Sequence, residues 1–152
     1  MENQNVISSE KIASIAIKKM LYTAKVHITG GREGNATSDD KRLNISLSTP
    51  GGPGNGTNPE QLFAAGWSAC FIGAMRHNAS SLQIPLPKDL AVDAEVDLGT
   101  SEGGFYLQAR LNVKLPGLSA EQAKTVVEAA HQTCPYSKAT HGNINLEINV
   151  AV

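Results

Sequence analysis

The stretch LAVDAEVDLGTSEGGFYLQARLNVKL, residues 90–115, carries the clearest structural signal in the chain. Apolar residues alternate with polar ones through residues 90–98, and the alternation resumes over residues 105–115. A period of two is typical of a strand with one buried face, and the glycine-containing segment 99–104 is typical of a turn. We therefore predict a hairpin of antiparallel strands with one apolar face.

Two helices are predicted, one before and one after this hairpin. The first begins at Asn58, which can cap a helix, with Pro59 at the first helical position, and continues to about residue 80. The second begins at a capping box formed by Ser119 and Gln122 and ends near Cys134, because a proline follows that residue.

Segments 21–29, 43–47 and 144–150 are predicted as further strands, with a turn over residues 30–34. The element order is then β-β-α-β-β-α-β, which predicts an α+β fold with antiparallel sheets packed on two helices. Residues 1–20 are expected to form an N-terminal leader, either a short helix or a loose arm, and residues 21–152 a single domain.

The composition excludes several classes of function. A net charge of −1 argues against nucleic acid or an anionic membrane as a partner, and no apolar run is long enough to span a bilayer. The polar start of the chain lacks a signal core, and two cysteines are too few for a secreted disulfide scaffold. We therefore expect a reducing cytoplasm. The cysteines and histidines stand in no zinc-ligand spacing, so no metal is expected.

Cys70 lies in the middle of the first predicted helix, in the small-residue stretch GWSACFIGAM, residues 66–75. Gly66, Cys70 and Gly73 share one helical face, which predicts close packing against another backbone, in a helix–helix seam. On this helix alone, the thiol is most simply a small core residue. A reactive thiol needs a nearby cation, because the helix dipole fades within the first turn. The candidate cations elsewhere are Arg32, Arg110, His131 and Lys138.

Cys134, the second thiol of the chain, lies beside Pro135 at a predicted helix end, where the backbone can shift more than inside a helix. Such freedom suits a cysteine that must bring its Cβ to about 4 Å from the Cβ of a partner.

Three segments carry a resemblance to a known family: LYTAKVHITGGREG (21–34), LSTPGGPGNGTNPEQLFAAGWSACFIGAM (47–75) and HQTCPYSKATHGNINLEINV (131–150). The chain resembles organic hydroperoxide resistance proteins, the Ohr branch of the Ohr/OsmC family, over roughly residues 20–152. It departs from the usual CPYSNATRGN motif at Lys138 and His141, its loop before Thr57 is short, and its leader is longer than expected.

The resemblance implies a thiol-dependent peroxidase that reduces alkyl and fatty-acid hydroperoxides to alcohols through a cysteine sulfenic acid and an intramolecular disulfide. It implies that Cys70 is the peroxidatic thiol, that Cys134 is the resolving thiol, and that Arg32 and Glu60 complete the site. It further implies an intertwined homodimer, no bound cofactor, and reduction by the dihydrolipoyl group of a lipoylated partner protein.

Helix geometry adds one expectation. Glu60 and Cys70 are ten residues apart, or about 15 Å along a straight helix, so one arginine side chain cannot easily contact both. An arginine that bridges them requires either that the carboxylate and the thiol come from two subunits or that the helix bends. We predict the first, in which Arg32 and Glu60 of one subunit serve Cys70 of the other and the glycine face packs between the two copies of this helix.

An apolar wall near the thiol is expected to favour alkyl or lipid hydroperoxides over hydrogen peroxide, because it recovers burial energy. Its members would be Leu62, Phe63, Trp67, Phe71 and Tyr136. Ordinary core packing explains Trp67 and Phe71 equally well.

Two other functions remain open from the sequence. One is a non-catalytic dimeric binding protein with structural cysteines, which a hydroperoxide would leave unchanged. The other is an OsmC-type peroxidase with a different reductant or substrate, which turnover with dihydrolipoamide and with thioredoxin would distinguish.

Overall fold

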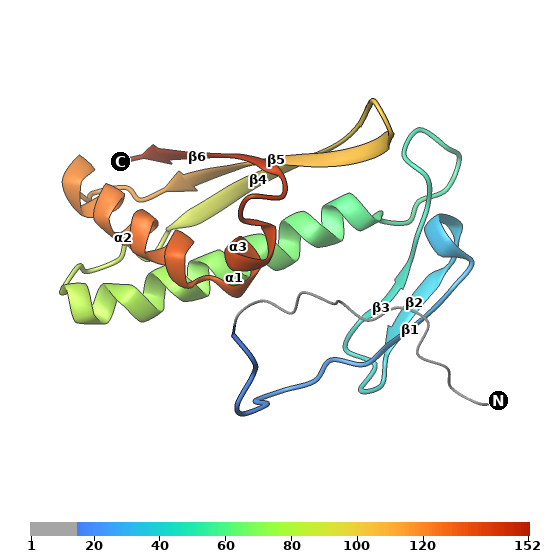
Figure 1. Cartoon of the computed structure of the whole chain (residues 1–152), viewed down its shortest axis with the longest axis horizontal. Coiled ribbons are helices and arrows are strands. Elements are labelled where there is room, and N and C mark those ends of the chain that lie inside the picture. Colours follow the sequence, from blue (N-terminus) through green and yellow to red (C-terminus); the bar gives the residue numbers. More distant parts are fainter. Residues whose placement is uncertain (1–14) are drawn as a thin grey trace.

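The structure, a computed structural model, describes residues 15–152 (Figure 1). Most of the predicted leader, residues 1–14, lies outside the described residues, and residues 15–20 are exposed and in neither a helix nor a strand. The elements are, in order, β1 (Val26–Thr29), the 3-10 turn η1 (Gly31–Glu33), β2 (Asn35–Ser38), β3 (Asn44–Ser46), α1 (Pro59–Leu82), β4 (Ala91–Ser101), β5 (Gly104–Lys114), α2 (Ala120–Thr133), α3 (Pro135–Thr140) and β6 (Asn145–Ala151).

These elements form two parts of unequal size. In the larger part, α1 and α2 cover one face of the sheet β4-β5-β6 (Figure 1). In the smaller part, the sheet β1-β2-β3 lies beyond the first turn of α1 (Figure 1). The predicted α+β class is confirmed.

The predicted hairpin is confirmed as β4 and β5. Their antiparallel ladder runs from Ala91 opposite Lys114 to Ser101 opposite Gly104, so the turn is shorter than the predicted segment 99–104. Gly103 lies inside it with a φ of 91°, a conformation that glycine adopts without strain. The inward side chains of β5, such as Leu111 and Val113, are fully buried.

The last strand corrects the expectation of purely antiparallel sheets. β6 pairs parallel to β5, from Asn145 opposite Gln108 to Ala151 opposite Lys114. Strands joined by a hairpin must be antiparallel, but the chain reaches β6 through α2 and α3, and such a crossover permits the parallel direction.

The small sheet also differs in detail from the prediction. The strand predicted over residues 21–29 is limited to β1, because residues 21–25 are not paired in a ladder. β2 was not predicted, since its sequence NATS lacks the alternation of large apolar residues that marks a strand. The strand predicted over residues 43–47 is β3, and Leu47 continues it as a single bridge to Thr57.

Helices α1 and α2 begin at the capping residues that the sequence predicts. The Asn58 side chain accepts a hydrogen bond from the Gln61 backbone N–H, at 2.9 Å, and α1 then continues to Leu82. Both bonds of the predicted capping box at Ser119 are present at the start of α2. The short helix α3 after Pro135 was not predicted.

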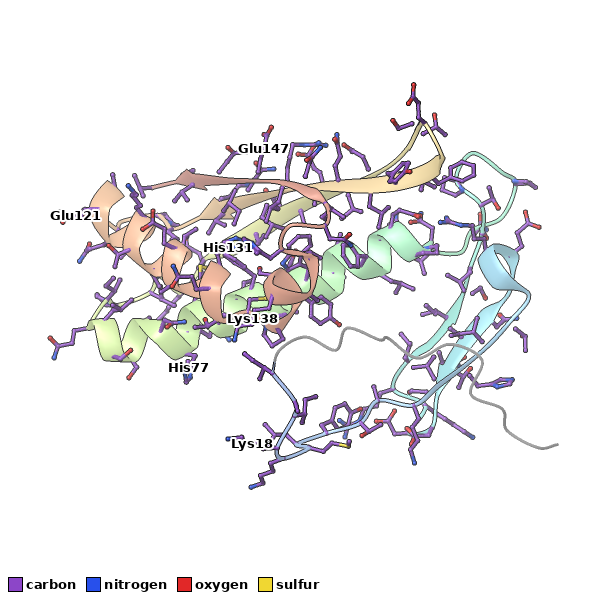
Figure 2. All side chains as sticks on the ribbon, viewed as in Figure 1. Lys18, His77, Glu121, His131, Lys138 and Glu147 are labelled. Atoms are coloured by element: carbon purple, nitrogen blue, oxygen red, sulfur yellow. The ribbon has the colours of Figure 1, made fainter. Side chains whose placement is uncertain are left out.

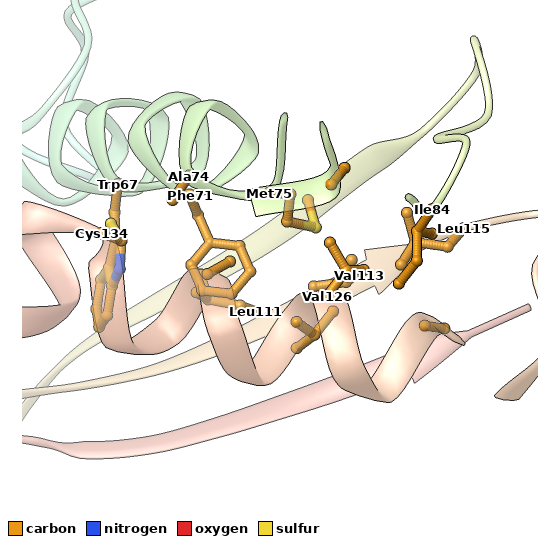
Figure 3. Packing of buried hydrophobic residues seen from close by; sticks show 14 of the residues in the cluster. Trp67, Phe71, Ala74, Met75, Ile84, Leu111, Val113, Leu115, Val126 and Cys134 are labelled. Carbon is orange, nitrogen blue, oxygen red and sulfur yellow. The ribbon is translucent and has the colours of Figure 1, made fainter. Parts of the chain in front are cut away.

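The core lies between the helices and the large sheet. Trp67, Phe71 and Met75 point from α1 into this layer, where they meet side chains of β5 and α2 such as Leu111 and Val126 (Figure 3). Within residues 15–152, no helix is both long and apolar enough to cross a membrane.

Candidate active site

The two cysteines of the chain lie together. Cys70 is in the middle of α1, and Cys134 is the residue between α2 and α3. Both are free thiols, and the Cys134 thiol donates a hydrogen bond to the Cys70 sulfur with the two Sγ atoms 3.3 Å apart. A disulfide has a sulfur–sulfur distance of about 2.05 Å, so oxidation of this pair to a disulfide would require only a small approach of the two sulfur atoms. Cys134 is fully buried, whereas Cys70 is partly exposed.

The surroundings of Cys70 within one chain favour the neutral thiol. Burial raises the pKa of Cys70, and the Cys134 thiol raises it further, whereas a hydrogen bond from the Tyr136 backbone N–H lowers it. Among residues 15–152 of the same chain, no cation contributes to this pKa.

None of the four candidate cations contributes to the pKa of Cys70 within one chain. Arg110 lies on the sheet surface that faces away from the helices, where it pairs with Glu95 and Asp97. The His131 ring, at the end of α2, faces the His141 ring with centroids 6.2 Å apart, and burial lowers the pKa of His131. Lys138 lies on α3 (Figure 2).

Arg32, the fourth candidate, forms an ion pair with Glu60. Its two terminal nitrogens donate to the two carboxylate oxygens over 2.9 and 2.6 Å, which is a bidentate geometry. Hydrogen bonds from Arg32 lower the pKa of Glu60, and the same bonds raise the pKa of Arg32. Glu60 comes from the first turn of α1 and Arg32 from η1, so this pair fastens the small sheet to the helix.

The four expected site residues therefore form two separate pairs. α1 is continuous from Pro59 to Leu82, which places Glu60 about 15 Å from Cys70 along its axis. The expectation that one chain does not bring Arg32 to Cys70 agrees with this arrangement.

The expected glycine seam is different in one respect. A Cβ at Gly66 would come within 3.2 Å of the Tyr136 ring, so this glycine makes room for a side chain of α3 rather than for another backbone. A Cβ at Gly73 would meet nothing within 4 Å in the same chain.

Only part of the expected apolar wall is accessible. Trp67 and Phe71 are 0% exposed and belong to the core, because the α1 face that carries them packs on α2 and β5. Tyr136 is 43% exposed, Leu62 is 36% exposed, and Phe63 is half-buried with its edge against the Trp67 ring. Of the five residues expected in the wall, Leu62, Phe63 and Tyr136 therefore keep accessible surface.

Two groups at the site were missed from the sequence. The Ser137 hydroxyl accepts a hydrogen bond from the Trp67 indole N–H, at 3.0 Å, and the Tyr136 backbone N–H reaches Cys70. Pro135 signals the break in the chain that creates α3, but nothing in the sequence gives the partners of these groups. Within residues 15–152, no cluster of side chains is suited to a metal ion.

A family model and several known proteins match this chain, and they point to the same family. Residues 52–149 match the family described as OsmC-like protein. The organic hydroperoxide resistance protein of Xanthomonas axonopodis pv. citri is 49% identical over 138 residues, which cover 88% of this chain and 97% of the relative.

Solved structures agree. An organic hydroperoxide resistance protein from Legionella pneumophila superposes with a TM-score of 0.82 at 43% identity, covering 88% of this chain and 100% of that chain. The Bacillus subtilis protein OhrB gives the same TM-score and identity, over 87% and 100% of the two chains. The chain therefore belongs to the OsmC-like protein family, in its organic hydroperoxide resistance branch.

Proposed function

We propose that this protein is a cysteine-based peroxidase that reduces organic hydroperoxides to alcohols. The observation that carries the proposal is the pair of free thiols with sulfurs 3.3 Å apart, one partly exposed and one buried. The names of the relatives point to the same class of substrate. Cysteines that only fill space in a core need neither a solvent-exposed sulfur nor contact between their two sulfur atoms.

The reaction divides between the two thiols. The Cys70 thiolate attacks one oxygen of the hydroperoxide, the O–O bond breaks, and the sulfur is oxidised to a sulfenic acid. The alkoxide that leaves takes up a proton and becomes the alcohol. The Cys134 thiolate then attacks the Cys70 sulfur, the S–S bond forms, the S–O bond breaks, and hydroxide leaves and takes up a proton to become water.

The activating cation is Arg32 of the partner subunit in a homodimer. Within one chain, Cys70 has a raised pKa and Arg32 is fixed on Glu60, so a second copy has to bring the guanidinium to the sulfur. A fixed guanidinium next to the thiol lowers its pKa and polarises the peroxide oxygens. Glu60 holds the arginine in place.

Exposed apolar side chains support the dimer. They gather in and before β1, on a part of the chain that packs little against the rest: Ile15, Ile17, Met20, Leu21, Tyr22, Val26 and Ile28. Contiguous apolar surface of this kind is typical of a protein interface.

The accessible wall of Leu62, Phe63 and Tyr136 suits alkyl and lipid hydroperoxides, since each gains burial energy that hydrogen peroxide does not. The disulfide is returned to two thiols by the dihydrolipoyl dithiol of a lipoylated protein. Because this cycle needs reduced thiols, we place the protein in the cytoplasm.

Steady-state turnover of tert-butyl hydroperoxide and of a fatty-acid hydroperoxide, with dihydrolipoamide as reductant, tests the function. Cys70→Ser is expected to abolish turnover and Cys134→Ser to leave a trappable sulfenic acid. A titration of the reduced protein with hydroperoxide, followed by mass spectrometry, tests the alternative. If both thiols stay unmodified in it, the protein is a binding protein with structural cysteines. Turnover with thioredoxin but without dihydrolipoamide would instead support the OsmC-type alternative.

A further inference from the structure

The short helix α3 is fastened to α1 by one fully buried hydrogen bond. The Trp67 indole N–H donates to the Ser137 hydroxyl oxygen over 3.0 Å. Trp67 is 0% exposed and Ser137 is 1% exposed, and Trp67 belongs to the buried apolar cluster shown in Figure 3. Buried polar groups in proteins are nearly always paired, and the pairing fixes the elements that carry them.

This bond lies close in sequence to the two groups that hydrogen-bond to Cys70, which are the Cys134 thiol and the Tyr136 backbone N–H. Ser137 is three residues after Cys134, the N-cap of α3, and directly after Tyr136, so it lies in the first turn of α3. Trp67 is three residues before Cys70, one turn away along α1. Fixing Ser137 on Trp67 therefore fixes the position of α3 along α1 at the point where the two sulfurs meet.

A second bond restrains the other side of Cys134. The Asn78 side-chain amide donates to the Thr133 hydroxyl over 2.7 Å, which joins α1 to the last residue of α2. Cys134 is thus held between one bond at Thr133 and one at Ser137. Without the bond at Ser137, the end of α2 would stay attached to α1 at Thr133, and α3 could move away from α1 on the side of Tyr136, which is 43% exposed.

We propose that Ser137 and Trp67 are positioning residues for the second step of the proposed reaction, in which the Cys134 thiolate attacks the oxidised Cys70 sulfur. The inference rests on the proposed peroxidase function. The two sulfurs must come from 3.3 Å to about 2.05 Å along a defined direction. A misplacement of about 1 Å at a reacting centre can cost on the order of a hundredfold in rate.

Two variants break the bond from opposite sides. Ser137→Ala leaves the buried indole N–H without its acceptor, and Trp67→Phe removes the donor while keeping an aromatic ring in the core. Ser137→Thr keeps the acceptor oxygen. Ser119→Ala is the matched control, because it also removes one serine hydroxyl that accepts a hydrogen bond, but at the far end of α2.

The experiment follows the fate of Cys70 after one equivalent of tert-butyl hydroperoxide. Reduced full-length proteins are quenched at intervals with dimedone and N-ethylmaleimide, and intact mass separates the trapped sulfenic acid from the disulfide. In Ser137→Ala and Trp67→Phe, disulfide formation is expected to slow by about tenfold or more, with trapped sulfenic acid accumulating. Ser137→Thr is expected to return the rate to within about threefold of the wild-type value, and Ser119→Ala to leave it unchanged despite lower stability.

The inference is overturned if disulfide formation in both bond-breaking variants stays within about twofold of wild type, or if Ser119→Ala slows it equally, since the effect would then follow general stability. Should Ser137→Ala not fold, the rate of disulfide formation in Trp67→Phe decides alone.

The proposed function and this inference fail in different ways. A wild-type protein that yields neither sulfenic acid nor disulfide overturns the proposed function, and this inference with it. A wild-type protein that forms the disulfide no faster than its two bond-breaking variants overturns this inference alone.

Discussion

Replacing Arg32 with alanine is expected to lower peroxidase activity by removing charge from a thiol in the other subunit. In one chain, burial raises the pKa of Cys70 above its ordinary value of about 8.5, so the neutral thiol predominates at pH 7. A guanidinium beside the sulfur favours the thiolate, because opposite charges attract each other more strongly in partly buried surroundings than in bulk water.

Exposure weakens that attraction. The Arg32 side chain is 44% exposed and is paired with Glu60, so solvent and the carboxylate both screen its charge. Removal of the guanidinium is still expected to lower the thiolate fraction of Cys70 at pH 7. We therefore expect Arg32→Ala to lower the rate of Cys70 oxidation by about tenfold or more at this pH.

The pH profile separates this cause from structural damage. As the pH rises above the pKa of the variant thiol, both proteins become ionised, so the rate of Arg32→Ala should rise more steeply with pH than the wild-type rate. The gap between the two rates should therefore narrow, and only the loss that comes from polarisation of the peroxide should remain at high pH. The assay is stopped-flow oxidation by tert-butyl hydroperoxide between pH 6 and 9.5. Arg42→Ala is the charge-matched control, because Arg42 is 89% exposed and lies in the same small sheet region. A wild-type rate for Arg32→Ala at pH 7, or a loss equal at every pH, would refute the reasoning.

Three other changes test the fold and the site. Gly66→Ala places a methyl group 3.2 Å from the Tyr136 ring and should raise KM for a bulky hydroperoxide while the free energy of unfolding changes by less than about 1 kcal/mol. An unchanged KM would contradict the proposal that this ring borders the substrate. Leu111→Ala, in the fully buried face of β5, should lower the free energy of unfolding in urea by about 2 to 5 kcal/mol, and a smaller loss would contradict tight packing there. Arg110 lowers the pKa of Asp97 from 3.8 to about 2, so this pair stabilises the fold above pH 4 and ceases to do so as the pH falls through 2. Asp97→Asn should therefore lower the free energy of unfolding at neutral pH and make its decrease between pH 4 and pH 2 shallower. Equal decreases in the two proteins over this pH range would contradict the reasoning.

The elements with strong local signals could be predicted from the sequence. The alternation over residues 90–115 gives the hairpin, and Asn58 and Ser119 give both helix starts, because period and capping act within a few residues. β2 has no such signal. The direction of β6 depends on how α2 and α3 cross the sheet, which is a property of the whole fold.

The site divides in the same way. The importance of Cys70 and Cys134 came from the family resemblance, since periodicity alone favoured a core residue at position 70. The separation of Glu60 from Cys70 could be predicted, because helix geometry fixes it. The hydrogen bond between Trp67 and Ser137 joins residues 70 positions apart, so it depends on tertiary packing that no local pattern encodes.

The central claim is that the arginine of one subunit activates the cysteine of the other, and a mixed dimer tests it most directly. Arg32→Ala and Cys70→Ser chains, carrying different tags, are co-expressed and the heterodimer is isolated by two affinity steps. Each parent homodimer lacks one essential group. If the two groups act across the interface, the heterodimer has one complete site, with Cys70 from the first chain and Arg32 from the second, and about half of the wild-type activity at pH 7. If they act within one chain, no complete site exists, and a heterodimer no more active than the Arg32→Ala parent would contradict the account.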